Sequence, residues 1–76
     1  MLIRKVSKMG SRMRVVYLPI TDFVRGEKVR LKPKSKNYFV VRKVSKMGSH
    51  LLVVIPKADW SYFRHRSDVY VMEAKG

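Results

Sequence analysis

The octapeptide RKVSKMGS occupies residues 4–11 and returns unchanged at residues 42–49, half of the 76-residue chain further on. The likeness continues beyond it, because Arg12-Met13-Arg14-Val15-Val16 aligns with His50-Leu51-Leu52-Val53-Val54, and a proline follows each segment. Eight identical consecutive residues in so short a chain indicate a duplicated unit. Two copies predict one folded body with an internal twofold axis rather than a solenoid, which needs at least three repeats.

Each copy predicts a strand, a turn and a second strand. In the first copy, a short basic segment leads to residues 7–11, whose serines and glycine favour chain reversal. Residues 13–18 are rich in β-branched and aromatic side chains, as strands are, and Pro19 ends them. In the second copy, residues 37–44 and 51–55 are the matching strands. Because residues 51–55 are apolar on both faces, we expect them to be the more deeply buried.

A short helix is expected after the second strand of each copy. Residues 20–24 place apolar side chains at i, i+3 and i+4, which is helical spacing, and a glycine follows them. Residues 57–66 predict a second helix, on which Trp60 and Phe63 would face the core. Stacking of single-stranded bases is the alternative role of the aromatic and basic cluster here, which comprises Trp60, Tyr62, Phe63, Arg64, His65 and Arg66.

The third strands complete a mainly β fold. Residues 28–34 alternate between apolar and basic side chains, and residues 68–73 form the corresponding last strand. The chain is therefore expected to be one domain over residues 1–76, with repeat one at about 2–36 and repeat two at about 37–76. Six strands and two short helices predict a six-stranded pseudo-twofold barrel built from two ββαβ repeats, because closure hides strand edges.

The charge of the chain is its strongest compositional feature. It has 18 Lys and Arg against 5 Asp and Glu, a formal net charge of +13. Such an excess destabilises a compact chain through self-repulsion, and a polyanion would relieve it while releasing counterions. Binding to a membrane surface usually needs a basic amphipathic helix, and the sequence contains none. The absence of a long apolar segment predicts a cytoplasmic protein, associated with the nucleoid.

Catalytic and metal chemistry are not expected. The chain has no cysteine, its two histidines are His50 and His65, and the acids are scattered. No phosphate-binding loop of the Gly-x-x-x-x-Gly-Lys-Ser/Thr type occurs. We therefore expect neither an enzyme nor a cofactor.

The basic residues of the two copies form the candidate binding site. Arginine can fork to phosphate or to a guanine edge, lysine supplies a point charge, and a two-stranded ribbon fits a major groove. The alternative is a solvated strand face. The set comprises Arg4, Lys5, Lys8, Arg12 and Arg14 in the first copy and Arg42, Lys43, Lys46 and His50 in the second.

The turns themselves are the second candidate. Their hydroxyls and backbone N–H groups could contact phosphate, although a tight turn needs the same residues for geometry alone. These positions are Ser7, Gly10, Ser11, Ser45, Gly48 and Ser49. Met9 and Met47 lie in the same turns, and we expect them to fill gaps at the ends of the barrel.

The pattern RKVSKMGS…VVIPK, followed by a short helix and a turn into an apolar strand, resembles the AbrB/MazE/SpoVT swapped-hairpin family. Ile55-Pro56-Lys57 and Leu18-Pro19 match its strand endings, and Gly26-Glu27-Lys28-Val29 is similar to its Gly-Asp turn. Family members usually carry one unit per chain and dimerise by exchanging hairpins. The resemblance thus implies a single-chain pseudo-dimer that is related to the cradle-loop barrels of double-psi and RIFT type. The protein would be either this monomeric pseudo-dimer or a homodimer.

The same resemblance implies double-stranded DNA as the partner, contacted by the basic residues named above. The function expected is that of a transcriptional regulator or a chromatin-type protein. RNA is the alternative partner, with a ribosome-associated role, because related barrels occur in translation proteins. An antitoxin-like module for protein interaction is the third possibility, but the C-terminal sequence Glu73-Ala74-Lys75-Gly76 is not the acidic tail that such proteins carry.

Overall fold

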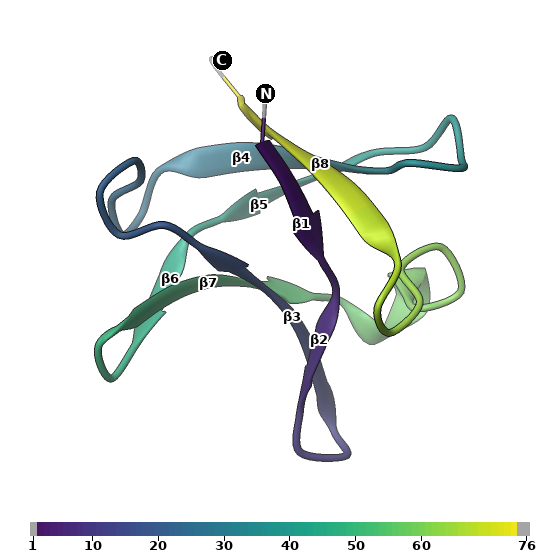
Figure 1. Ribbon diagram of the computed structural model, residues 1–76, viewed down its shortest axis with the longest axis horizontal. Helices are drawn as coiled ribbons and strands as arrows, with labels where there is room; N and C mark the ends of the chain where they lie inside the picture. Colours follow the sequence, from purple (N-terminus) through teal and green to yellow (C-terminus); the bar gives the residue numbers. More distant parts are fainter. Residues whose placement is uncertain (1, 75–76) are drawn as a thin grey trace.

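The computed structural model describes residues 2–74. Residues 1, 75 and 76 lie outside the described part of the chain. The last two residues of the expected second repeat, 75 and 76, are therefore not described. The described residues form β-strands joined by turns, with one turn of 3-10 helix (Figure 1). The elements are β1 (Leu2–Lys5), β2 (Ser7–Met9), β3 (Met13–Leu18), β4 (Lys28–Pro33), β5 (Val40–Lys43), β6 (Ser45–Met47), β7 (His50–Ile55), η1 (Lys57–Asp59) and β8 (Asp68–Glu73).

The mainly β class is confirmed, but the strands form two four-stranded antiparallel sheets and not one closed barrel. The first sheet has the order β1-β8-β4-β5 and the second the order β2-β3-β7-β6. Each sheet therefore combines strands from both halves of the chain. The central pairs are β4 with β8, where Leu31 lies opposite Val71, and β3 with β7, where Val16 lies opposite Val53.

The first strand of each copy is divided in two by a buried valine, which raises the strand number from the expected six to eight. Val6 separates β1 from β2, and Val44 separates β5 from β6; they are 1% and 2% exposed. The N–H of Val6 donates to Ser67 O and its carbonyl accepts from Arg66 N. At each valine, the chain leaves the first sheet and enters the second.

The core lies where the apolar faces of both sheets meet. Alternate residues of the four central strands supply most of it, because successive strand side chains point to opposite faces. Its members are Val6, Val16, Leu18, Phe23, Val29, Leu31, Val44, Leu51, Val53, Ile55, Phe63, Val69 and Val71. The deeper burial expected for residues 51–55 is confirmed, since four of the five side chains in this segment are buried. Full burial of each such side chain stabilises the fold by about 1.5–3 kcal/mol.

The first expected helix is absent, and residues 19–27 form turns instead. Of the helically spaced side chains only Phe23 is buried, whereas Ile20 and Val24 are 61% and 67% exposed. A helix of this length depends on tertiary packing of its apolar face. In this fold two of the three apolar side chains, Ile20 and Val24, are not covered by other residues. The carboxylate of Glu27 also accepts a hydrogen bond from Val24 N, which favours the turn.

The second expected helix is reduced to the single turn η1. Trp60 and Phe63 nevertheless face the core as expected: Phe63 is fully buried and Trp60 packs against the core. The carbonyls of both residues accept hydrogen bonds from the guanidinium of Arg14. A side chain from β3 thus takes over carbonyls that a continuing helix would use for its own backbone hydrogen bonds.

Candidate nucleic-acid interface

Two β-hairpins, β2–β3 and β6–β7, present the two copies of the repeated turn. They lie at opposite edges of the second sheet, and both turns are on the lower side of Figure 1. Gly10 and Gly48 adopt left-handed backbone conformations, with φ of 67° and 62°. The same local sequence thus places a glycine in the left-handed conformation in both turns, which glycine adopts without steric cost.

The two turns differ in length by one residue. Met9 lies opposite Met13 in the first hairpin, and Met47 lies opposite His50 in the second. His50 is therefore the counterpart of Met13, and the alignment of His50 with Arg12 made on sequence alone is wrong. Arg12 is the extra turn residue of the first hairpin and has no counterpart in the second. The same one-residue difference makes Leu51, a core residue, the counterpart of Arg14.

Arg14 contributes to the packing of the fold, because it occupies the place that the core residue Leu51 has in the second hairpin. It is half-buried, and its Nη1 donates to Trp60 O and Phe63 O, each at 3.1 Å. The guanidinium carbon lies 4.7 Å from the centre of the Trp60 ring, a cation–π distance. Its Nε is buried without a hydrogen-bond partner. These contacts hold residues 57–67 against the second sheet, so we leave Arg14 out of the interface.

The turn cations are available to a ligand. Lys8, Arg12 and Lys46 are exposed, and within residues 2–74 their side chains make no hydrogen bond or ion pair. His50 is exposed too, with its ring edge-on to Tyr17 at 5.7 Å. The charge of Lys8 reaches a neighbouring loop: the pKa of His65 is lowered from its usual 6.5, first by burial and then by the charges of Lys8, Arg66 and Arg14.

The turn hydroxyls and methionines have mixed exposure. Ser11, Ser45 and Ser49 are exposed, whereas Ser7 is half-buried. Met47 is 44% exposed and Met9 is half-buried. The expectation that they fill gaps at the ends of a barrel is not met at Met47, whose side chain is largely in solvent.

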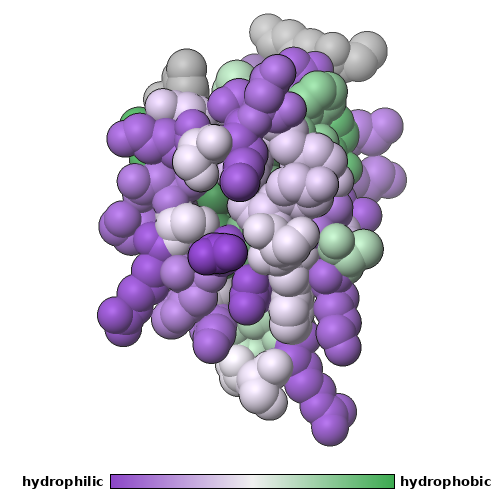
Figure 2. Space-filling view, turned by 90° about the vertical axis from the view of Figure 1, so that its right-hand side faces the viewer, coloured by the Kyte–Doolittle hydropathy of each residue, from purple (hydrophilic) through white to green (hydrophobic). Residues whose placement is uncertain are grey.

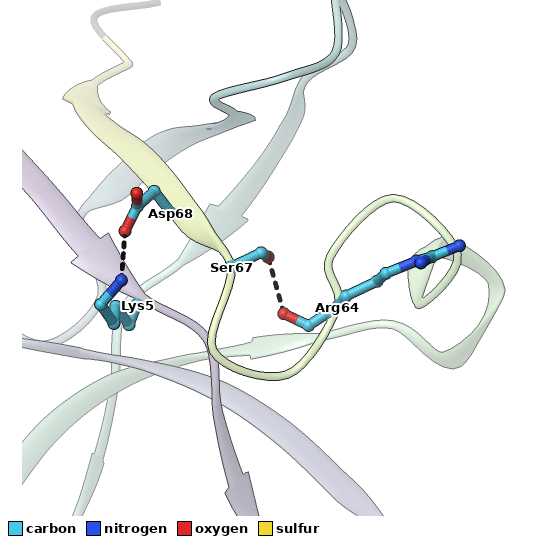
Figure 3. A network of polar contacts seen from close by, with 4 residues as sticks. All are labelled: Lys5, Arg64, Ser67 and Asp68. Atoms are coloured by element: carbon cyan, nitrogen blue, oxygen red, sulfur yellow. Dashed lines mark hydrogen bonds and ion pairs between the residues drawn. The ribbon is translucent and has the colours of Figure 1, made fainter.

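The cations of the first strands differ between the two copies. In the first copy, Arg4 Nε donates to Tyr17 O at 2.9 Å, and Lys5 Nζ forms an ion pair with Asp68 at 2.8 Å (Figure 3). The hydrogen bond from Lys5, and then its charge, holds the pKa of Asp68 below its usual 3.8. In the second copy, Lys43 lies opposite Lys28 and not opposite an acid.

Three further cations on β4 were not assigned to the site on sequence alone. Lys28, Arg30 and Lys32 alternate with the buried residues of this strand, so they lie on the outer face of the first sheet. Arg30 lies over the Phe39 ring at 4.7 Å, and Lys32 lies over the ring of Tyr70 at 5.6 Å. The sequence of residues 28–34 shows the alternation of apolar and basic side chains. This pattern does not distinguish a binding surface from a strand face that is only solvated.

The acids do little to offset these cations. Glu27 accepts from Val24 N, Asp59 accepts from the hydroxyl of Tyr38, and Asp68 is paired with Lys5. Figure 2 shows a face dominated by hydrophilic side chains, several of which extend outward from the body of the molecule. The charge of +13 is thus carried largely on the surface, since no charged residue in the described part of the chain is buried.

In residues 2–74 no helical turn has the length and apolar character needed to cross a bilayer. Nor do three side chains of the His, Cys, Asp or Glu type come together in this range as a metal site would require. The chain matches no protein-family model, no curated protein and no solved structure when compared with each.

Proposed function

We propose that this protein binds double-stranded DNA, with the turns of the β2–β3 and β6–β7 hairpins as its principal contacts. The observation that carries the proposal is the surplus of exposed, unpaired cations on two copies of one hairpin turn. Cations without internal partners release condensed counterions when they meet phosphate, and this release drives the sequence-independent part of DNA binding.

The hairpins suit a duplex in shape as well as in charge. A two-stranded β-ribbon is narrow enough to enter a major groove of about 12 Å. Arg12 can fork to phosphate or to a guanine edge from the tip of the first hairpin, while Lys8 and Lys46 supply point charges. Backbone contacts would set the position of the protein, and base contacts would add any preference for sequence.

The resemblance to the AbrB/MazE/SpoVT family supports the same partner. We propose that the two halves form a pseudo-twofold unit of this kind within one chain. The strand order supports it, because each half places its last strand in the first sheet and its hairpin in the second. As a regulator the protein would favour a near-palindromic site; as a chromatin-type protein it would coat DNA with little regard to sequence.

RNA is the second candidate partner, favoured by one observation. Tyr38 and Tyr62 stack at 4.0 Å, and Tyr62 is 40% exposed beside the basic residues Lys34, Lys36 and Arg64. An exposed aromatic next to cations can stack on an unpaired base. Such a platform would bind single-stranded loops, whereas the hairpin turns would bind duplex.

Binding of fluorescent duplex DNA and of a structured RNA at one salt concentration tests the proposal. The variant Lys8→Gln/Arg12→Gln/Lys46→Gln removes the turn cations, and Lys34→Gln/Lys36→Gln/Lys57→Gln removes the same charge from exposed positions elsewhere. We expect the first variant to weaken duplex binding much more than the second. Equal losses would show that the hairpins are not the interface, and preference for RNA with loss in the second variant would support the alternative.

A further inference from the structure

Two open grooves occupy matching places beside the two copies of the repeat. The first is lined by Ile3, Arg4, Lys5, Ser7, Tyr17 and Asp68. The second is lined by Val41, Arg42, Lys43, Ser45, Val54 and Lys28. The two sets correspond residue by residue, and the charge differs at a single position, where the first groove has Asp68 and the second has Lys28.

The strand register explains why this one difference matters. Asp68 is the first residue of β8 and lies opposite Lys5, while Lys28 is the first residue of β4 and lies opposite Lys43. The first groove therefore contains its own counter-anion, at 2.8 Å from Lys5 (Figure 3). The second groove contains Lys28, Arg42 and Lys43, and no carboxylate lines it.

The second groove places like charges directly across a strand pair, which destabilises a sheet. Within residues 2–74 the side chains of its three cations make no hydrogen bond or ion pair with one another or with other side chains, although the backbone carbonyl of Lys28 accepts from Ala74 N. The hydroxyl of Ser45 adds a neutral donor, and Val41 and Val54 complete the lining of the groove. Three cations and a hydroxyl supply the positive charge and the hydrogen-bond donors that bind a phosphate group.

We propose that the groove formed by Lys28, Arg42, Lys43 and Ser45 binds a backbone phosphate of duplex DNA, and that its counterpart beside Asp68 does not. This inference rests on the proposed function and deepens it. The two repeats are then unequal: both present a hairpin turn, but only the second holds a phosphate beside it. Asp68 occupies the place of that phosphate in the first groove.

Exchange of the two groove residues tests the inequality. Lys28→Asp gives the second groove the acid of the first, Asp68→Lys gives the first groove the lysine of the second, and the double variant has the charge of the original chain. Lys36→Asp, at an exposed loop position, is the control with the same charge change as Lys28→Asp. Thermal unfolding of each variant establishes that it is folded.

We expect Lys28→Asp to weaken duplex binding and to reduce the slope of log K against log salt by about one more contact than the control does. Asp68→Lys should strengthen binding, and the double variant should bind like the original chain. If Lys28→Asp and Lys36→Asp lose affinity equally, or if the double variant binds no better than Lys28→Asp, the groove assignment is wrong.

Titration with inorganic phosphate, followed by backbone amide chemical shifts, separates this inference from the proposed function. Shifts confined to residues 41–45 support the groove even if duplex DNA fails to bind, which would overturn the proposed function alone. Equal shifts at residues 3–7 and 41–45, or no shift at either, would overturn the inference.

Discussion

Arg66 adopts the left-handed backbone conformation that Gly26 adopts at the corresponding place in the first half of the chain. Their φ angles are 69° and 91°. Each donates its N–H at 2.8 Å to the carbonyl of a buried bend valine, Arg66 to Val6 and Gly26 to Val44. The residue at this position therefore holds the bend between the two sheets. In the first half of the chain it is glycine, which adopts the left-handed conformation without steric cost, whereas in the second half it is Arg66.

Arg66→Gly should stabilise the protein. A side chain in the left-handed region costs about 1–2 kcal/mol, and the greater freedom of glycine in the unfolded chain offsets part of the gain. We expect a net gain of about 0.5–1 kcal/mol, seen as a rise of roughly 2–8 °C in Tm. Arg66→Ala removes the same charge but keeps Cβ, so its Tm should rise less. Equal Tm values for the two variants would mean that charge and not backbone strain is responsible.

Arg14→Met should destabilise the protein. The substitution leaves the carbonyls of Trp60 and Phe63 without their donor and removes the contact with the Trp60 ring. We expect a loss of about 2–3 kcal/mol in the free energy of unfolding, measured by denaturant titration. Arg12→Met, at an exposed turn position, should change it by less than about 0.5 kcal/mol. A similar loss in both variants would contradict the structural role of Arg14.

The ion pair of Lys5 with Asp68 should make stability depend on pH at the acid side. Because folding lowers the pKa of Asp68, its contribution is present above the ordinary value of 3.8 and disappears as pH falls through the lower folded pKa. Asp68→Asn should therefore have a lower Tm than the original chain at pH 7, and the gap should close toward pH 2. A gap that stays constant over this range would show that Asp68 stabilises the fold by some means other than its charge.

Lengthening the second hairpin should strengthen DNA binding. The first turn contains Arg12, and the second lacks a counterpart because it is one residue shorter. Insertion of an arginine between Ser49 and His50 should restore that cation and steepen the salt dependence by about one contact. Insertion of glutamine at the same place is the control for turn length. If both insertions change affinity alike, the tip charge of the second hairpin is not in contact with DNA.

The strands were predictable from the sequence because their signals are local. The repeat, the turn residues and the alternation of residues 28–34 located six strand segments, and the apolar segment 51–55 was expected to be deeply buried. The helices were not predictable, because i, i+3, i+4 spacing around Phe23 requires a surface to cover Ile20 and Val24, and the fold provides none.

The site was predictable only in outline, because contacts between distant segments decide which cations are free. Arg14 and Arg12 look alike in sequence, yet one extra turn residue places Arg14 on the core side of β3 and leaves Arg12 exposed. Lys28 and Asp68 become comparable only once the register places them opposite Lys43 and Lys5. The eight-residue identity therefore hides two differences between the copies: the extra residue in the first turn, and the distant residue that lies opposite Lys5 or Lys43.

The salt dependence of duplex binding by the unmodified chain tests the central claim most directly. Six cations are assigned to phosphate: Lys8, Arg12, Lys28, Arg42, Lys43 and Lys46. Because Lys28, Arg42 and Lys43 share one phosphate, these cations account for four phosphates, and at about 0.9 counterions per phosphate log K should fall against log salt with a slope of roughly −4 on a duplex of mixed sequence. Failure to bind duplex at low salt, or a slope near zero, would contradict the claim that these cations grip DNA.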